Sequence, residues 1–249
     1  MQNIKKHFDE FTFNTWIMPV GIACTPFLVI AIYIGLVSLD WIEASINFSL
    51  GIFLLTFGGY IARQWGKNYE QKMFQELGGM PTTIILRFSD KTIDNVTKLK
   101  YHKLLNNIIP DVELPLSLQE EQEDQISDEK YTSVMRFLRV NANSNRDKYP
   151  RVYQELKKYN FWRNLYGCRI IFSLSYLAFL ARECVVINNF SFKEMVITPY
   201  PKYVVFFVLA GWIIIFLMVV TKKTVKSNAF DYAKTLLETL ENISNDKNT

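Results

Sequence analysis

Long apolar runs occur in two pairs along this chain, and a long polar block separates the pairs. The most apolar run, Tyr203–Val220, contains no charged residue, and neither does the first run, Thr15–Leu39. The second run, Ala44–Ala62, ends at Arg63. A helix needs about 20 apolar residues to cross the roughly 30 Å hydrocarbon core of a bilayer. Since only helices and closed barrels satisfy their backbone there, the pattern predicts a helical integral membrane protein.

The third apolar run is the least regular, because only 12 uncharged residues lie between Arg169 and Arg182. As a helix they would rise about 18 Å, so the predicted span extends to residues 165–187 with both arginines near its ends. We interpret the arginines as snorkelling to the interfaces. The alternative is that Arg182 pairs with Asp40 or Glu43 in the loop between the first two runs.

Several side chains around the third run suit a membrane interface. Aromatic rings favour the headgroup region and arginines favour lipid phosphate. The predicted interface anchors are Trp162, Arg163, Tyr166, Arg169 and Arg182.

The expected fold is therefore an all-α integral membrane protein with four transmembrane helices in two hairpins. The N-terminal hairpin comprises residues 1–62, with spans 15–39 and 44–62, and the C-terminal hairpin comprises residues 165–220, with spans 165–187 and 203–220. Residues 63–164 form a mainly helical cytoplasmic domain with an acidic linker at 110–129, and residues 221–249 form a cytoplasmic tail. Lysines and arginines gather on the side of both termini and of the middle block. That bias places both termini in the cytoplasm of a bacterial inner-membrane protein.

Helical periodicity runs through the middle block. Three segments repeat an apolar face with the spacing i, i+3, i+4, i+7, which is typical of an amphipathic helix; they begin at Tyr101, Tyr131 and Tyr149. The β-branched segment Thr82–Phe88 predicts a short strand or an extended loop.

The most distinctive candidate site is GGMPTTIILR, Gly78–Arg87. Successive amides after two glycines can bind an anion, and threonine and arginine side chains can add phosphate donors. The alternative, which we favour, is a helix C-cap followed by a proline turn. The tentative ligand-binding residues are Gly78, Gly79, Thr82, Thr83, Arg87 and His102.

Composition restricts the chemistry further. The net charge of +4 is modest, which argues against specific nucleic-acid binding. The three cysteines have no metal-ligand spacing, and a lone histidine, His102, is weak evidence for catalysis. We interpret His102 as a surface or anion-contacting residue beside Lys98, Lys100 and Lys103. We therefore expect no metal, no cofactor and no enzymatic activity.

Three segments together resemble a known family: GGMPTTIILR, TKLKYHKLL and YPRVYQELKKYNFWRNLYGCR. The chain is similar to a group of uncharacterised bacterial multi-span membrane proteins that have a GG-x-PTT-x-x-LR segment and an Arg-Asn-Leu-x-Gly segment before a span. The resemblance covers about residues 65–169 and implies no activity. In layout alone, the chain also resembles four-span effectors of bacterial anti-phage systems.

The leading hypothesis is an oligomeric inner-membrane protein whose cytoplasmic domain senses a ligand or partner and acts on the spans, in anti-phage defence or stress signalling. Its expected partners are the lipid bilayer, further copies of itself, and a cytoplasmic protein or an anionic small molecule. Two alternatives stay open. One is a membrane scaffold that recruits a cytoplasmic partner, and the other is a membrane-bound enzyme that acts on a nucleotide or lipid through His102 and Arg87.

Overall fold

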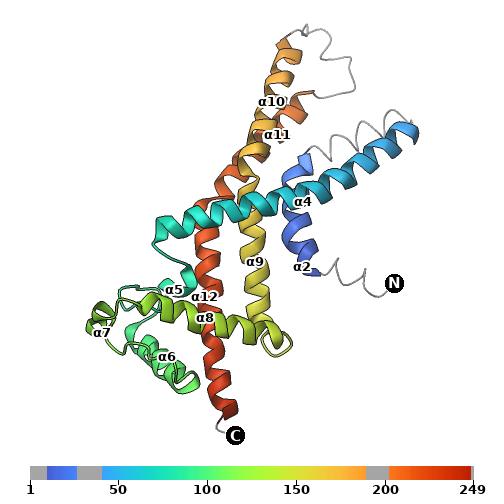
Figure 1. Ribbon diagram of the computed structural model, residues 1–249. Helices are drawn as coiled ribbons and strands as arrows, with labels where there is room; N and C mark the ends of the chain where they lie inside the picture. The colour runs from blue at the N-terminus through green and yellow to red at the C-terminus, as the bar shows by residue number, and fades with distance from the viewer. Residues whose placement is uncertain (1–9, 27–40, 189–201, 248–249) are drawn as a thin grey trace. The chain divides into compact units, whose positions relative to one another are not determined.

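The computed structural model describes residues 10–26, 41–188 and 202–247, and every regular element within these ranges is a helix (Figure 1). The predicted all-helical class is therefore confirmed. The helices are α2 (Glu10–Thr12), the π-helix η1 (Phe13–Ile17), α4 (Trp41–Leu77), α5 (Pro81–Ile84), α6 (Asn95–Ile108), α7 (Leu118–Glu123), α8 (Ser127–Ser144), α9 (Pro150–Gly167), α10 (Arg169–Asn188), α11 (Lys202–Val219) and α12 (Lys222–Lys247).

None of the helices within these ranges is both long enough and apolar enough to pass through a bilayer. The predicted four-span membrane fold and the predicted inner-membrane location are therefore wrong. Helix α4 turns polar from Arg63 onward, and α10 begins at Arg169 and contains Arg182. Helix α11 has 18 residues and begins with Lys202, so it rises only about 27 Å against a hydrocarbon core of about 30 Å. Most of the predicted first span lies outside the described residues.

The chain divides into two compact units. One comprises Met1–Tyr69 and Phe161–Thr224, and the other comprises Glu70–Asn160 and Val225–Thr249. Helices α4, α9 and α12 each contribute residues to both units. We call them the hairpin unit and the helical block, and each is described separately.

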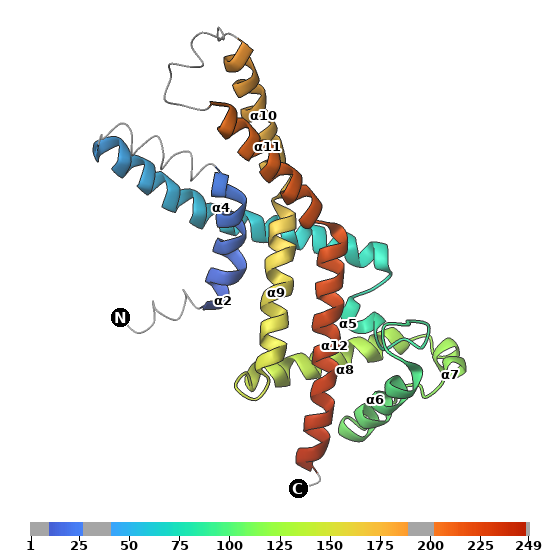
Figure 2. The ribbon, with the colours of Figure 1, turned by 180° about the vertical axis from the view of Figure 1, so that it is seen from behind.

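The hairpin unit takes its name from α10 and α11, which pack side by side, as both ribbon views show (Figure 2). Tyr176, Leu209 and Ile213 are buried between these two helices. A second apolar cluster combines side chains from the helical residues 18–26, α4, α9, α10 and α11. Its buried members include Val20, Ala62, Leu165, Cys168 and Phe216.

The helical block is built around amphipathic faces. The predicted face of α8 is confirmed, because Tyr131, Val134, Met135 and Leu138 have no exposed surface. In α6, Tyr101 and Leu105 are buried in the same way. Residues 82–88, predicted as a strand or extended loop, instead form α5 and a series of turns. Pro81 stands at the first position of α5, where its missing amide costs nothing.

Two more segments of the helical block differ from the expected layout. The acidic segment 110–129 contains α7 and the start of α8. A capping box begins α7, since the Ser117 hydroxyl accepts from the Glu120 amide and the Glu120 carboxylate accepts from the Leu116 amide. The last segment, expected to be a tail, is α12, in which Leu236, Leu237 and Leu240 are completely buried.

Candidate functional site

The Gly78–Gly79 turn ends α4. Gly78 has φ 73° and Gly79 has φ 154°, and both values lie in the region that favours glycine. The Gly79 amide donates to the Phe74 carbonyl at 2.9 Å, and the Gly78 amide donates to the Gln75 carbonyl at 3.2 Å. This is the Schellman pattern of a helix C-cap. The two amides therefore satisfy carbonyls of α4 and do not point to a ligand.

Arg87 ties this turn to α8. Its Nη2 donates to the Gly78 carbonyl at 2.7 Å, and its Nε donates to Asp128 Oδ1 at 2.8 Å. The hydrogen bond with Asp128 raises the pKa of Arg87, which stays cationic. A Cβ atom on Gly79 would lie 2.9 Å from Arg87 Nη2. The structure thus brings Gly78, Gly79 and Arg87 together, as the candidate site requires, but the guanidinium is already engaged.

The two threonines of the candidate site belong to α5, and both are buried. The Thr83 hydroxyl lies 3.1 Å from the Thr132 hydroxyl of α8. This contact packs α5 onto α8, and it leaves the Thr83 hydroxyl turned toward the protein.

His102 is completely buried, so the prediction that it lies at the surface is wrong. Its Nδ1 is 2.6 Å from the Pro115 carbonyl oxygen, and its Nε2 is 3.0 Å from the Leu86 carbonyl oxygen. The rings of Phe88 and Tyr131 lie against the imidazole. Burial lowers the pKa of His102, which favours the neutral ring, and a neutral ring donates to only one of the two carbonyls. His102 is therefore placed to join three segments rather than to reach a substrate.

Lys98 is a buried lysine near His102, with 1% of its surface exposed. Its Nζ donates to the carbonyls of Arg87 and Asp90, each at 2.6 Å. Burial lowers the pKa of Lys98. The lysine closes the turn after α5, whereas the sequence placed it on an exposed basic face.

Glu121 completes this polar network from α7. Its Oε2 accepts from the Phe88 amide at 2.7 Å and from the Tyr131 hydroxyl at 2.8 Å. Burial and the bond to Glu121 raise the pKa of Tyr131. The carboxylate therefore connects α7, α8 and the turn after α5. No sequence motif indicated Glu121, because this residue lies in an acidic run that is typical of a solvent-exposed loop.

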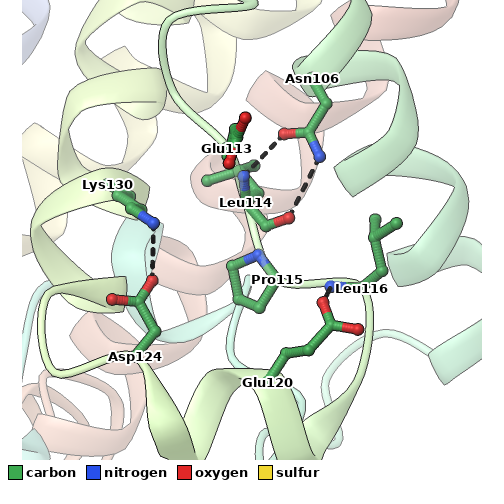
Figure 3. Close-up of a pocket in the computed structure, with 8 residues that line it drawn as sticks. All are labelled: Asn106, Glu113, Leu114, Pro115, Leu116, Glu120, Asp124 and Lys130. Carbon is green, nitrogen blue, oxygen red and sulfur yellow. Dashed lines mark hydrogen bonds and ion pairs between the residues drawn. The ribbon is translucent and has the colours of Figure 1, made fainter.

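The helical block also contains an open cavity of about 510 Å³ beside α7 (Figure 3). Its lining residues are Asn106, Glu113, Leu114, Pro115, Leu116, Glu120, Asp124 and Lys130. Asn106 of α6 holds the wall in place, since its side-chain amide exchanges two hydrogen bonds with the Leu114 backbone, at 2.8 and 3.1 Å. Asp124 and Lys130 form an ion pair at 2.8 Å. No part of the sequence analysis singled out this cavity.

The predicted interface anchors have other roles in the hairpin unit. Arg163 and Asn164 are buried in α9, and both Nε and Nη2 of Arg163 donate to Asn164 Oδ1 at 3.1 Å. Arg169 Nη2 donates to the Leu217 carbonyl near the end of α11, at 3.2 Å, and so satisfies one of the last four carbonyls of that helix.

The aromatic anchors pack within the same unit. The Tyr166 ring lies 4.2 Å from the Tyr69 ring, and Trp162 meets Phe161 edge to face. The Arg182 side chain lies outside the described residues, and so does its alternative pairing with Asp40 or Glu43.

Together these contacts limit what the predicted ligand site can do. In the described part of the chain, no group of three or more histidine, cysteine, aspartate or glutamate side chains is placed to hold a metal ion. Nε and Nη2 of Arg87, Nζ of Lys98 and both ring nitrogens of His102 face carbonyl oxygens or a carboxylate of the same chain. Ligand binding at residues 78–87 stays a prediction.

Comparisons with known proteins gave no match to a family model, to a curated protein or to a solved structure. The family resemblance of the GGMPTTIILR and RNLYG segments therefore stays an expectation. No related protein supports a place in a membrane or a role in anti-phage defence.

Proposed function

We propose that this protein is a self-associating interaction protein, and that two copies meet through the outer faces of α10 and α11. The observation that carries the proposal is the amount of apolar surface that these helices expose. Single exposed apolar side chains are ordinary, but a contiguous patch larger than a few hundred Å² marks an interaction site.

The exposed apolar side chains of α10 form a stripe. Ile170, Leu174 and Leu177 expose 74%, 61% and 53% of their surface, and Ala181 is exposed at the next position of the same face. These residues are spaced by four, three and four positions. That is the heptad spacing through which one helix packs along another.

Helix α11 repeats the same spacing. Phe207, Ile214 and Met218 expose 69%, 57% and 73% of their surface, and Gly211 lies between the first two. A Cβ atom on Gly211 would meet nothing within 4 Å, so a partner helix has room to approach there.

A second copy of the chain suits these stripes best. Both stripes lack charge, so two identical surfaces do not repel each other. Each stripe places three large apolar side chains, all more than half exposed, along one helix, and together they would form the apolar centre of an interface that takes about 800 Å² from each partner. Two hairpins packed through such stripes would form a four-helix arrangement.

This proposal makes the chain an interaction protein and not an enzyme. The contacts of Arg87 and His102 favour it, because Nε and Nη2 of Arg87 and both ring nitrogens of His102 lie against oxygen atoms of the same chain. The proposal keeps the expected association between copies of the chain and includes no membrane span.

The test is the mass of the purified full-length chain by analytical ultracentrifugation across a concentration series. We expect the wild-type chain to self-associate. Leu174→Glu and Ile214→Glu each place a charge in the middle of one stripe, so both variants should shift the equilibrium toward the monomer. Val96→Glu is the matched control, because Val96 of α6 is 81% exposed and lies in the helical block.

Circular dichroism would show that each variant keeps its helices. A wild-type chain that is monomeric throughout the series would contradict the proposal. A chain that is monomeric with detergent bound to these stripes would also contradict it.

A further inference from the structure

The cavity beside α7 carries a net negative charge. Glu113, Glu120 and Asp124 supply three carboxylates to its lining, and Lys130 supplies one ammonium group, which pairs with Asp124. Figure 3 shows Glu113 above Leu114 and Glu120 below Leu116, on either side of Pro115. The volume of about 510 Å³ lies within the range of sites that accept a side chain or a small ligand. The chemistry of this lining suits a cation with an adjoining apolar group.

Two of the three carboxylates have partners inside the chain. Glu120 accepts from the Leu116 amide at 2.7 Å, and Asp124 is held by Lys130. Glu113 forms no hydrogen bond or ion pair with the described part of the chain. Leu116, which also lines the cavity, exposes 38% of its surface. The cavity lining thus includes one uncommitted carboxylate and one exposed apolar side chain.

A complementary group stands on the outer face of α8. Phe137 and Val140 expose 41% and 61% of their surface, although the opposite face of this helix is buried. Arg136 is exposed beside them, and its guanidinium contacts no carboxylate within the described residues. Phenylalanine and arginine are both enriched at protein interfaces relative to the rest of the surface.

We propose that the cavity of one copy of this chain receives Arg136 and Phe137 from another copy. The guanidinium would pair with Glu113, and the Phe137 ring would pack on Leu116. The two halves are opposite in charge, and each is left uncommitted by its own chain.

The same chain leaves its own cavity open, because the Arg136 guanidinium contacts no carboxylate within the described residues. Lys130, in the cavity wall, and Arg136 lie on one continuous helix, about 9 Å apart along its axis and about 120° apart around it. Two copies can fill each other's cavities in a two-fold pair, or each copy can fill the cavity of the next. In either arrangement the contact is additional to the one proposed through α10 and α11.

The experiment exchanges charges between the two halves. Glu113→Arg and Arg136→Glu are made singly and together in the full-length chain that also carries Leu174→Glu, and association is measured by ultracentrifugation. Each single variant should weaken association about tenfold or more, because each leaves like charges facing across the contact. The double variant restores opposite charges and should restore association. An equimolar mixture of the two single variants should restore it as well.

The Leu174→Glu background separates this proposal from the proposed function, since the contact uses no residue of α10 or α11. If the α10 stripe does not contribute to association, the charge variants should still change association in the way described above. Phe137→Ala should weaken association, whereas Val96→Ala, which also removes an exposed apolar side chain, should not.

Circular dichroism again checks folding. Unchanged association in both single variants would overturn the proposal. A double variant that stays as weak as the single variants would overturn it too, because their effects would then not arise from one contact between copies.

Discussion

Gly167 of α9 lies so close to Gly66 of α4 that a Cβ atom built on Gly167 would overlap the Gly66 amide nitrogen. A Cβ atom on Gly66 would in turn meet Asn164 Oδ1 at 2.7 Å. The Asn164 amide group donates to the Thr15 carbonyl at 2.6 Å. Within the hairpin unit, the backbones of α4 and α9 are therefore in direct contact. The buried Asn164 also connects this crossing to η1, which contains Thr15.

Replacing Gly167 with alanine should destabilise this crossing. The new methyl group would meet backbone atoms, which cannot rotate away, so we expect a loss of about 3 kcal/mol in the free energy of unfolding, at the upper end of overpacking effects. Gly21→Ala is the control in the same unit, because its Cβ position meets only Leu55 Cδ2, at an ordinary contact distance of 3.9 Å. Alanine there should be neutral or stabilising by about 0.5–1 kcal/mol. The measurement is the free energy of unfolding of both variants in urea. Equal values for the two variants would contradict the close contact between Gly66 and Gly167.

Part of this packing has a local signal in the sequence. Gly58 and Gly59 lie within an apolar run, where small residues allow close helix contact, and a Cβ atom on Gly59 would stand 3.0 Å from the Trp16 carbonyl oxygen. The Gly66–Gly167 contact could not be predicted in the same way. The two glycines are far apart in sequence, and polar side chains surround both, so no periodic pattern joins them.

The amphipathic helices were predictable for a similar reason, and the membrane spans were not. In α8 the apolar spacing reflects one buried face, which is a local property of the sequence. An apolar run, by contrast, indicates only that its side chains are shielded from water, and it does not indicate what covers them. Whether a lipid or another helix covers Leu174 depends on the length of the helix and on its charged ends, which in α10 include Arg169 and Arg182.

Arg87→Ala should destabilise the helical block by about 1–2 kcal/mol, because the Gly78 carbonyl and Asp128 both lose a charged donor. The comparison is Lys100→Ala. Lys100 also forms an ion pair, with Glu241 at 2.8 Å, but more than half of each side chain is exposed, so its loss should change stability by less than about 0.5 kcal/mol. Thermal or urea unfolding compares the two. An Arg87 variant as stable as the Lys100 variant would show that the bond to Gly78 contributes little.

Acidification should destabilise the helical block through His102. Burial holds its pKa below the ordinary value of 6.5, so the unfolded chain binds a proton before the folded chain does. Stability is therefore complete above about pH 6.5 and falls as the pH drops toward the folded pKa. Glu121 and Lys98, the charged groups that face the ring, act in opposite directions on it. The measurement is the urea midpoint from pH 7.5 to pH 5.0.

His102→Gln is the control for this pH dependence, because glutamine keeps a donor and does not titrate. The variant should lose most of the difference between the two ends of the series. Asp94 and Asp124 have pKa values lowered below 3.8 by their hydrogen bonds, so their effect appears only at lower pH. A wild-type chain that becomes more stable on acidification would show that the two carbonyls outweigh burial and favour the charged ring.

The candidate site shows the same limit of sequence reasoning. The Gly-Gly-Met-Pro motif correctly indicated a helix end and a turn, since glycine and proline act locally. It could not indicate that Asp128 of α8 would take the guanidinium of Arg87, or that Lys98 would close the next turn. Those partners come from other helices, and nothing in the sequence distinguishes their side chains from ordinary surface charges.

The C-terminal helix supplies the sharpest test of the block's architecture, because the sequence suggested a tail after residue 220. Leu240 of α12 is completely buried, so Leu240→Ala should lower the free energy of unfolding by about 2–5 kcal/mol through lost transfer energy and an unfilled cavity. Lys234→Ala on the exposed face of the same helix should change it by less than about 0.5 kcal/mol. If α12 were a tail, neither substitution would matter, since neither side chain would leave water on folding. A large, one-sided loss in the leucine variant would instead show that the block cannot fold without this helix.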